Sequence, residues 1–352
     1  METLAFYNEG CLQLLRPTVP GLSLVSAAAP PPDICNNSSH THSITISRED
    51  LIASVVEIHA GILSLEEDLR PSGPVNELFS RLVSLCLHRC EIDFGNPEHV
   101  NAEVAEIRGS LIRLCGKAEG LLEEHYARIL GDLPEPHNSF HLFPYYSNYL
   151  KLAMLEHHLL LGAAAAFSSI SMSAPEPMEK VAFIGSGPMP LTSIVLAANH
   201  LRNAVFDNYD LDPQANELAS KLVSRDPDLS ARMRFHTCDI LQVGQEMASY
   251  DVVFLAALVG LDQELKRKIL KHLSDNMRHG ASLVVRSANS ARAFLYPIVD
   301  LSLLQDAGFQ VLSVFHPTDE VVNSVIVAKL TNKTLPLPLP IPAPALPSSS
   351  SH

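Results

Sequence analysis

The chain has 352 residues, of which 47% are hydrophobic and 18% are charged, a composition typical of a globular protein large enough for two domains. Its formal net charge of −14 argues against nucleic-acid binding, which requires a basic surface. The six cysteines include no CxxC pair, so we expect reduced thiols rather than disulfides. The histidine pairs His40/His42 and His157/His158 have no further ligands at metal spacing, so we expect no structural metal.

The two ends of the chain do not have the pattern of folded domains. Residues 1–46 are rich in Ala, Pro, Ser and Asn, poor in basic residues, and lack a secretory signal, which predicts a disordered extension. Residues 331–352 alternate proline with apolar residues and end in serines, which is typical of an extended, polyproline-like tail. The most apolar run, Leu159–Phe167, is too short to cross a bilayer, so we expect no membrane span and a cytoplasmic protein.

Helical patterns fill residues 47–173, which we predict to form a helical domain. Ser47 is followed three positions later by Asp50, as at a helix N-terminus, and apolar residues then recur at helical spacing. Turns rich in glycine and proline separate this helix from a second one near residues 78–86. A third helix is expected over about 102–130 and a fourth over about 150–169.

The third predicted helix is apolar on two sides, which indicates packing on two sides. One stripe consists of Ile107, Leu111, Leu114, Ala118, Leu121 and Ile129. Glu119 falls on the second stripe, between Cys115 and Leu122, where desolvation would raise the pKa of its carboxyl. The alternative is a glutamate at the stripe edge with its carboxylate in water. Tyr126 to Ile129 also matches a vesicle-sorting signal, but we assign these residues to the core, with vesicle association as the alternative.

Three of the eight tyrosines, Tyr145, Tyr146 and Tyr149, follow in one short stretch. Tyrosine offers a flat apolar face and a hydroxyl. The cluster could therefore line a substrate pocket or join two packed helices.

Strand-like and helical patterns alternate over residues 174–330, which predicts a doubly wound, mostly parallel sheet. The expected strands are Val181–Ile184, Ala204–Tyr209, Met233–Thr237, Asp251–Ala257, Ala281–Arg286, Gln310–Phe315 and Val322–Ala328. Helices are expected near residues 190–201, 213–224, 262–278 and 291–307. Only a short loop joins the last two strands, so the seventh strand should be antiparallel to the sixth.

A glycine turn, Gly185-Ser186-Gly187, follows the first of these strands and precedes a helix, as in sites that cradle a nucleotide. The second strand ends in Asp207 and Asp210, and an acid there can accept hydrogen bonds from ribose hydroxyls. Their spacing from the glycines also fits NAD. Two observations argue against NAD. Pro190 occupies the position of the third glycine of the GxGxxG dinucleotide-binding motif, and Asp239 after the third strand is placed to meet an adenine amino group.

These features resemble the seven-stranded, Rossmann-like fold of S-adenosylmethionine-dependent transferases. Longer strings resemble the nicotianamine synthases of plants over roughly residues 50–329: LIRLCGKAEGLLE, FPYYSNYLKL, IGSGPMPLTSIVLA, FDNYDLD, YDVVFLAALVG and residues 286–297. The chain departs from that family at Lys117, where an acid is usual, and at Asn289-Ser290, where glycine is common.

The resemblance implies that three molecules of S-adenosylmethionine are condensed by two 3-amino-3-carboxypropyl transfers and one closure of an azetidine ring. The products are nicotianamine, a metal chelator, and three methylthioadenosines. S-adenosylmethionine is then the substrate, and no cofactor or metal is needed. The rivals are a methyltransferase on the same fold and a catalytically inactive scaffold.

The resemblance also implies roles for individual residues in the helical domain. Glu119 would deprotonate the attacking α-ammonium group, and Tyr145 would orient or relay the proton. Tyr146 and Glu123 are second choices for this chemistry. The helical domain would close over the carboxyl ends of the strands as a lid.

In the second domain, Gly185-Ser186-Gly187, Asp210 and Asp239 would bind S-adenosylmethionine. Arg286 and Arg292 would either clamp substrate carboxylates or form structural salt bridges. The sequence gives no indication of the oligomeric state.

Overall fold

The computed structural model describes residues 45–96, 98–171 and 177–331. The expected N-terminal extension and proline-rich tail lie almost entirely outside the described residues, as do Cys11, Cys35, His40 and His42. The expected domain boundary near residue 173 also lies outside them. The four described cysteines are free thiols.

Among the described residues, four long helices precede the sheet. They are α1 (Arg48–Leu63), α2 (Gly73–Leu87), α3 (Ala102–Gly131) and α4 (Tyr146–Ser171), with a 3-10 helix, η1 (Pro136–Leu142), between the last two. Ser47 caps α1 as predicted, because its hydroxyl oxygen accepts the backbone N–H of Asp50 at 3.1 Å. Asn101 caps α3 in the same way through the backbone N–H of Val104.

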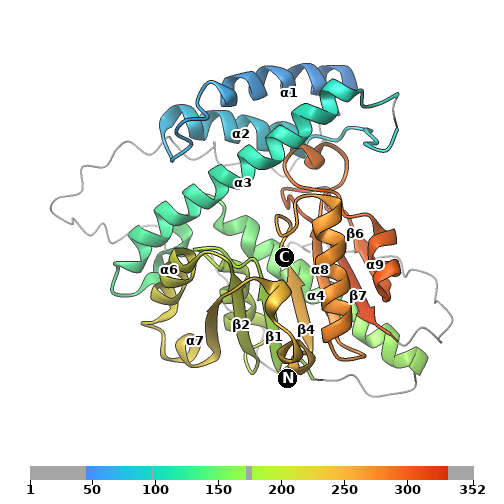
Figure 1. The fold of residues 1–352 in the computed structure, drawn as a ribbon. Helices are drawn as coiled ribbons and strands as arrows, with labels where there is room; N and C mark the ends of the chain where they lie inside the picture. The colour runs from blue at the N-terminus through green and yellow to red at the C-terminus, as the bar shows by residue number, and fades with distance from the viewer. Residues whose placement is uncertain (1–44, 97, 172–176, 332–352) are drawn as a thin grey trace, which may run out of the picture. The chain divides into compact units, whose positions relative to one another are not determined.

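α3 joins two hydrophobic cores and runs from the layer of α1 and α2 to α6 (Figure 1). Leu111 and Leu114 in its first half lie in the core shared with α1 and α2. Ala127 and Leu130 near its end lie in the core of the sheet. α3 therefore packs against two cores, as its two stripes predicted, but at different positions along its length: its first half packs against α1 and α2, and its end packs against the core of the sheet. The prediction was wrong for Ile129, which is 41% exposed.

α4 is longer and more apolar than the sequence estimate suggested. Its segment Tyr146–Ser168 is long and apolar enough, by length and composition alone, to cross a membrane. The prediction of no membrane span considered only the run Leu159–Phe167 and therefore underestimated the length of the apolar segment. One face of α4, which includes Leu152, Leu155, Leu159 and Leu160, is buried in the core of the sheet. A core helix passes the same test of length and composition.

The seven predicted strands form one sheet in the order β3-β2-β1-β4-β5-β7-β6. They are β1 (Lys180–Ile184), β2 (Val205–Asp210), β3 (Met233–Thr237), β4 (Val252–Leu255), β5 (Ser282–Ser287), β6 (Phe309–Phe315) and β7 (Ser324–Leu330). The first five strands are parallel, and β7 is antiparallel to both of its neighbours, which confirms the predicted topology. The bounds of β3 are as predicted, and those of the other strands differ by at most two residues, as at β7.

The helices around the sheet depart from prediction in two places. They are α5 (Leu191–Val195), α6 (Pro213–Val223), α7 (Pro227–Arg232), α8 (Gln263–Asn276) and α9 (Leu301–Ala307). The helix expected over residues 291–307 is wrong: a 3-10 helix, η5 (Ser290–Phe294), is followed by α9, with Pro297 between them. α7 was not predicted, although Asp226 and Pro227 carry the cap and first-turn signals of a helix.

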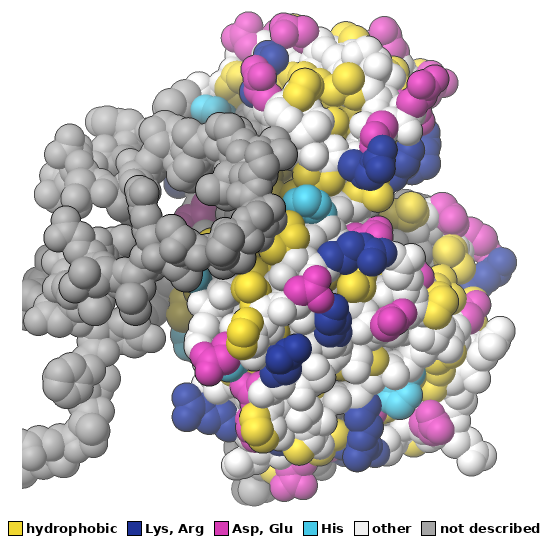
Figure 2. All heavy atoms as spheres, turned by 90° about the vertical axis from the view of Figure 1, so that its left-hand side faces the viewer, with side chains coloured by type: hydrophobic (Ala, Val, Ile, Leu, Met, Phe, Trp, Pro, Cys, Tyr) yellow, Lys and Arg dark blue, Asp and Glu magenta, His cyan; other side chains and the backbone are white. Residues whose placement is uncertain are grey.

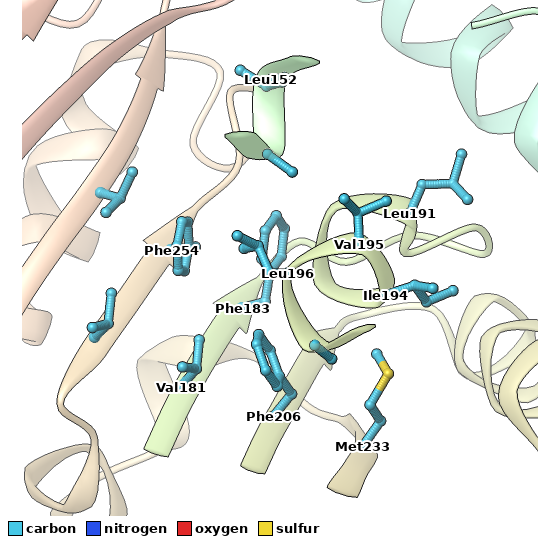
Figure 3. Packing of buried hydrophobic residues seen from close by; sticks show 14 of the residues in the cluster. Leu152, Val181, Phe183, Leu191, Ile194, Val195, Leu196, Phe206, Met233 and Phe254 are labelled. Carbon is cyan, nitrogen blue, oxygen red and sulfur yellow. The ribbon is translucent and has the colours of Figure 1, made fainter. Parts of the chain in front are cut away.

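Both faces of the sheet are covered, which explains the continuous apolar runs of the strands. Phe183 and Phe254 stack with their ring centroids 5.6 Å apart on the face covered by α4 and α5. Figure 3 shows these rings and Phe206 on the same side as Val195 of α5. Each fully buried side chain of this size contributes about 1.5–3 kcal/mol. The carboxyl ends of the parallel strands are thereby held in fixed positions.

The surface mixes charges of both signs. On the face seen in Figure 2, basic and acidic side chains are interspersed over the described residues. Acidic side chains lie between the basic ones among the described residues that this view shows.

Candidate active site

The glycine turn at the end of β1 has a backbone that only glycine adopts easily. Gly185 has φ 78° and Gly187 has φ 67°, both in the left-handed region. A β-carbon at Gly185 would lie 2.3 Å from Cγ2 of Val259, and one at Gly187 would lie 2.8 Å from Oε2 of Glu123. The turn is therefore closely packed by the loop after β4 on one side and by α3 on the other.

Acids at the ends of the next strands lie along the same edge of the sheet. Asp210, the last residue of β2, accepts the Gly187 N–H at 2.8 Å through Oδ2. Asp239 follows β3 and caps a short 3-10 helix, η3 (Ile240–Gln242), through the Leu241 N–H. Asp207 is only 4% exposed, and its Oδ1 lies 2.7 Å from Nε2 of His236. Asp210, rather than Asp207, is thus the acid that meets the glycine turn.

Two glutamates one turn apart on α3 share a tyrosine. The hydroxyl of Tyr149 donates to Oε1 of Glu123 at 2.8 Å and lies 3.5 Å from Oε1 of Glu119. The hydroxyl of Tyr296 donates to Oε2 of Glu119 at 3.0 Å. Glu123 is 8% exposed and Glu119 is half-buried. These four side chains form the acid–tyrosine cluster.

The surroundings of this cluster favour protonated carboxyl groups. Burial raises the pKa of Glu119, and hydrogen bonds from Tyr296 and Tyr149 partly oppose this. Burial raises the pKa of Glu123 well above its usual range, and the charges of Glu119 and Asp210 raise it further. The desolvation expected for Glu119 from its stripe is therefore present, and Glu123 experiences it more strongly.

The tyrosines selected from the sequence lie near the cluster but do not form it. Burial, and then the charge of Glu119, raise the pKa of Tyr145, whose hydroxyl is hydrogen-bonded to the side chain of Ser80. The ring of Tyr146 contacts Phe140, with centroids 6.1 Å apart. The catalytic roles of both stay predictions.

Sequence reasoning named Tyr149 only as part of a tyrosine cluster that could line a pocket, and it gave Tyr296 no role. Tyr149 was visible in the tyrosine-rich stretch, three residues after Tyr146 and hence its neighbour on the surface of α4. Tyr296 belongs to the string that resembles nicotianamine synthases, but nothing in its local pattern points to α3.

The first of the two arginines, Arg286 on β5, forms a buried ion pair. Its Nε and one terminal nitrogen donate to the two oxygens of Glu156 at 2.7 and 3.1 Å. The same terminal nitrogen donates to the hydroxyl of Thr192 at 2.6 Å. The structure favours the salt-bridge interpretation of Arg286. Arg292 instead donates to the backbone carbonyl of Asp319, and its Nε has no partner among the described residues.

The two departures from the family pattern have separate consequences. Lys117 donates to the backbone carbonyl of Glu66 at 3.0 Å, so its ammonium group is bound at the surface. Ser290 has φ 53°, in the left-handed region that favours glycine. Its hydroxyl donates to the carbonyl of Cys90, which fixes the loop after β5 against the helical layer.

α3 closes the carboxyl edge of the sheet. A β-carbon at Gly116 would lie 3.2 Å from Leu258 of the loop after β4. Further along, Glu124 accepts the side-chain amide of Gln214 at 2.8 Å, at the start of α6. Helix α3 therefore contacts the segments that follow β1, β2 and β4, and places Glu123 against the glycine turn.

A seven-stranded sheet with an antiparallel β7, a glycine turn after β1 and acids after β2 and β3 defines the class of S-adenosylmethionine-dependent transferases. The sequence model of the family described as "Nicotianamine synthase protein" matches residues 45–334. The chain belongs to the nicotianamine synthase family.

Individual relatives agree with this assignment. The chain is 52% identical to "Nicotianamine synthase 1" of Arabidopsis thaliana over 291 residues, which are 81% of this chain and 86% of that protein. It is 48% identical to "Nicotianamine synthase" of Solanum lycopersicum over 299 residues, 85% of this chain and 89% of that one. Among solved structures, MtNAS in complex with MTA and tNA has the same fold, with a TM-score of 0.63, 21% identity, and coverage of 80% of this chain and 98% of that one.

Proposed function

We propose that this chain condenses three S-adenosylmethionine molecules into nicotianamine and releases three methylthioadenosines. The observation that carries the proposal is the acid–tyrosine cluster, whose Glu123 α3 places against the glycine turn. Holding a nucleoside does not require a pair of hydrogen-bonded carboxyl groups beside the glycine turn. We call this turn the donor turn, because it would hold the donor S-adenosylmethionine. Both the kinship with nicotianamine synthases and the buried acids of the site support the same chemistry.

The charges of the site fit this substrate. S-adenosylmethionine carries a sulfonium and an α-ammonium group, and Glu119, Glu123 and Asp210 converge where the methionyl arm would lie. The nearby guanidinium of Arg286 is already bonded to Glu156, so it leaves the carboxylates available to cations. We assign the adenosine to the edge formed by Asp210 and Asp239.

The reaction needs orientation and a base rather than a metal. The sulfonium already makes methylthioadenosine a good leaving group, so the protein must present the methylene carbon of the methionyl arm, not the methyl group, to the amine. Free α-amino groups titrate near pH ~8. A carboxylate whose pKa is raised towards neutrality is a stronger base for that ammonium than an ordinary one. Glu119 is assigned this role.

The test is mass spectrometry of the products formed by the full chain with S-adenosylmethionine as sole substrate. We expect nicotianamine and methylthioadenosine. Adenosylhomocysteine would indicate methyl transfer and contradict the proposal, as would the absence of any product.

A matched pair of variants tests the base. Glu119→Gln should bind S-adenosylmethionine in calorimetry yet lose product formation. Glu106→Gln changes an exposed acid on the same helix and should retain both. Near-normal turnover by Glu119→Gln would remove Glu119 from the mechanism.

A further inference from the structure

Resting on the proposed function, we propose that Glu119 and Glu123 act as one proton-sharing pair, in which the Tyr149 hydroxyl passes the proton between the carboxyl groups and Tyr296 positions Glu119. Glu119 takes a proton from the α-ammonium group, which thereby becomes the attacking amine. Glu123 then receives this proton beside the donor turn. Tyr149 and Tyr296 act through the glutamates and are positioning residues.

The geometry of Tyr149 suits a relay. Its hydroxyl lies between the two Oε1 atoms, 2.8 Å from Glu123 and 3.5 Å from Glu119. A hydroxyl donates one hydrogen bond and accepts others. When Glu119 is protonated, it can donate to the tyrosine oxygen while the tyrosine donates to Glu123. A shift of both protons then moves one proton from Glu119 to Glu123 and leaves the tyrosine neutral.

The outer oxygens of the two glutamates have different environments. Oε2 of Glu119 accepts the Tyr296 hydroxyl at 3.0 Å, which fixes the plane of this carboxyl group. Oε2 of Glu123 lies against Gly187, whose N–H is bonded to Asp210. The pair therefore extends from the helical domain to the donor turn.

Charged and titratable groups from several parts of the chain face the pair. Arg286 on β5 lowers the pKa of both glutamates, and Asp210 on β2 raises that of Glu123. The hydrogen bonds of Tyr149 on α4 lower the pKa of both glutamates, and Tyr296 after η5 lowers that of Glu119.

Cys115 on α3 and Tyr145 also lie near Glu119. Burial and Glu119 raise the pKa of each, so both stay neutral. Two carboxylates this close cannot both ionise easily, so they titrate as a pair.

The proton balance of the reaction explains the use of such a pair. In each transfer the ammonium gives one proton to Glu119, and the resulting amine attacks the methylene carbon. The carbon–sulfur bond breaks, its electrons stay on sulfur, and neutral methylthioadenosine leaves. The product nitrogen retains one positive charge, so one proton is released per transfer. A pair that moves this proton to Glu123 restores Glu119 as a base for the next transfer, once Glu123, which is 8% exposed, has passed the proton to solvent.

The test is Tyr149→Phe with Tyr126→Phe as its control. Tyr126 is a half-buried tyrosine of α3 that packs edge-on against Phe143 and lies outside the pair. The measurement is methylthioadenosine release from S-adenosylmethionine as a function of pH. Since the pair must be ionised to accept a proton, the wild-type rate rises with pH through the pKa of the pair.

We expect Tyr149→Phe to lower kcat about 10–100-fold with little change in the KM for S-adenosylmethionine. Because the lost hydrogen bonds favour the ionised glutamates, the acid limb of the profile should move up by about one pH unit. Tyr126→Phe should keep the wild-type rate and profile. A Tyr149→Phe enzyme with the wild-type rate, or with a lower rate but an unmoved acid limb, would overturn the proposal.

Calorimetry with S-adenosylmethionine shows whether Tyr149→Phe has folded. If that variant does not bind the substrate, Glu123→Gln takes its place, and it must lower kcat while retaining substrate binding. Wild-type kcat in Glu123→Gln would overturn the relay. A failure of the proposed function is distinct from all of these results, because the wild-type chain would then release no methylthioadenosine.

Discussion

Replacing Glu156 by Gln should destabilise the protein strongly, because it leaves the buried Arg286 guanidinium without its counter-charge. Glu156 is 0% exposed and Arg286 is 8% exposed, and two hydrogen bonds of 2.7 and 3.1 Å join them. Breaking a buried, hydrogen-bonded pair on one side costs about 3–5 kcal/mol. The chain has no Trp, so urea unfolding should be followed by far-ultraviolet circular dichroism.

Two controls isolate the cause of this loss. Glu264→Gln removes an exposed pair with Arg267 and should cost less than about 1 kcal/mol. Arg286→Met combined with Glu156→Gln removes both charges and should recover most of the loss, since no unpaired charge stays buried. The reasoning is refuted if Glu156→Gln costs no more than the Glu264 control, or if the double variant is less stable than the single one.

Two further predictions concern the donor turn and a histidine stack. Gly187→Ala adds about 1–2 kcal/mol of left-handed backbone strain, and its β-carbon pushes on Glu123. Calorimetry should therefore show that S-adenosylmethionine binds at least about tenfold more weakly. The control is Gly120→Ala on α3, where nothing lies within 4 Å of the added carbon, and it should leave binding unchanged. Burial, and then the charge of His200, lower the pKa of His157 from 6.5 to about 4. Between these two values the unfolded chain binds the proton better than the folded chain does. The stability of the fold should therefore decrease as the pH falls from 6.5 to about 4. His157→Phe keeps the ring stacked on His200 and should flatten that part of the Tm-against-pH curve, whereas an unchanged slope would contradict the assignment.

Local signals were sufficient for most of the fold. The apolar run before Gly185, the glycines themselves and the short connection before β7 each depend on residues close in sequence, and they predicted the strands, the turn and the antiparallel final strand. The same reliance on local periodicity joined η5 and α9 into one helix, although Pro297 lies between them.

The candidate site was only partly predictable, because its contacts join distant residues. Glu119 could be selected from its stripe on α3. Its partner Tyr296 is 177 positions away, and the Arg286–Glu156 pair spans 130 positions. No local pattern specifies such contacts. They arise only when the helical domain packs onto the edge of the sheet.

The central claim is that the amine attacks the methylene carbon of the methionyl arm and not the methyl group. S-adenosylmethionine labelled with carbon-13 in its S-methyl group tests this most directly. Aminocarboxypropyl transfer predicts that all of the label stays in methylthioadenosine and that nicotianamine is unlabelled. Label in any acceptor product, with adenosylhomocysteine formed in equal amount, would contradict the account.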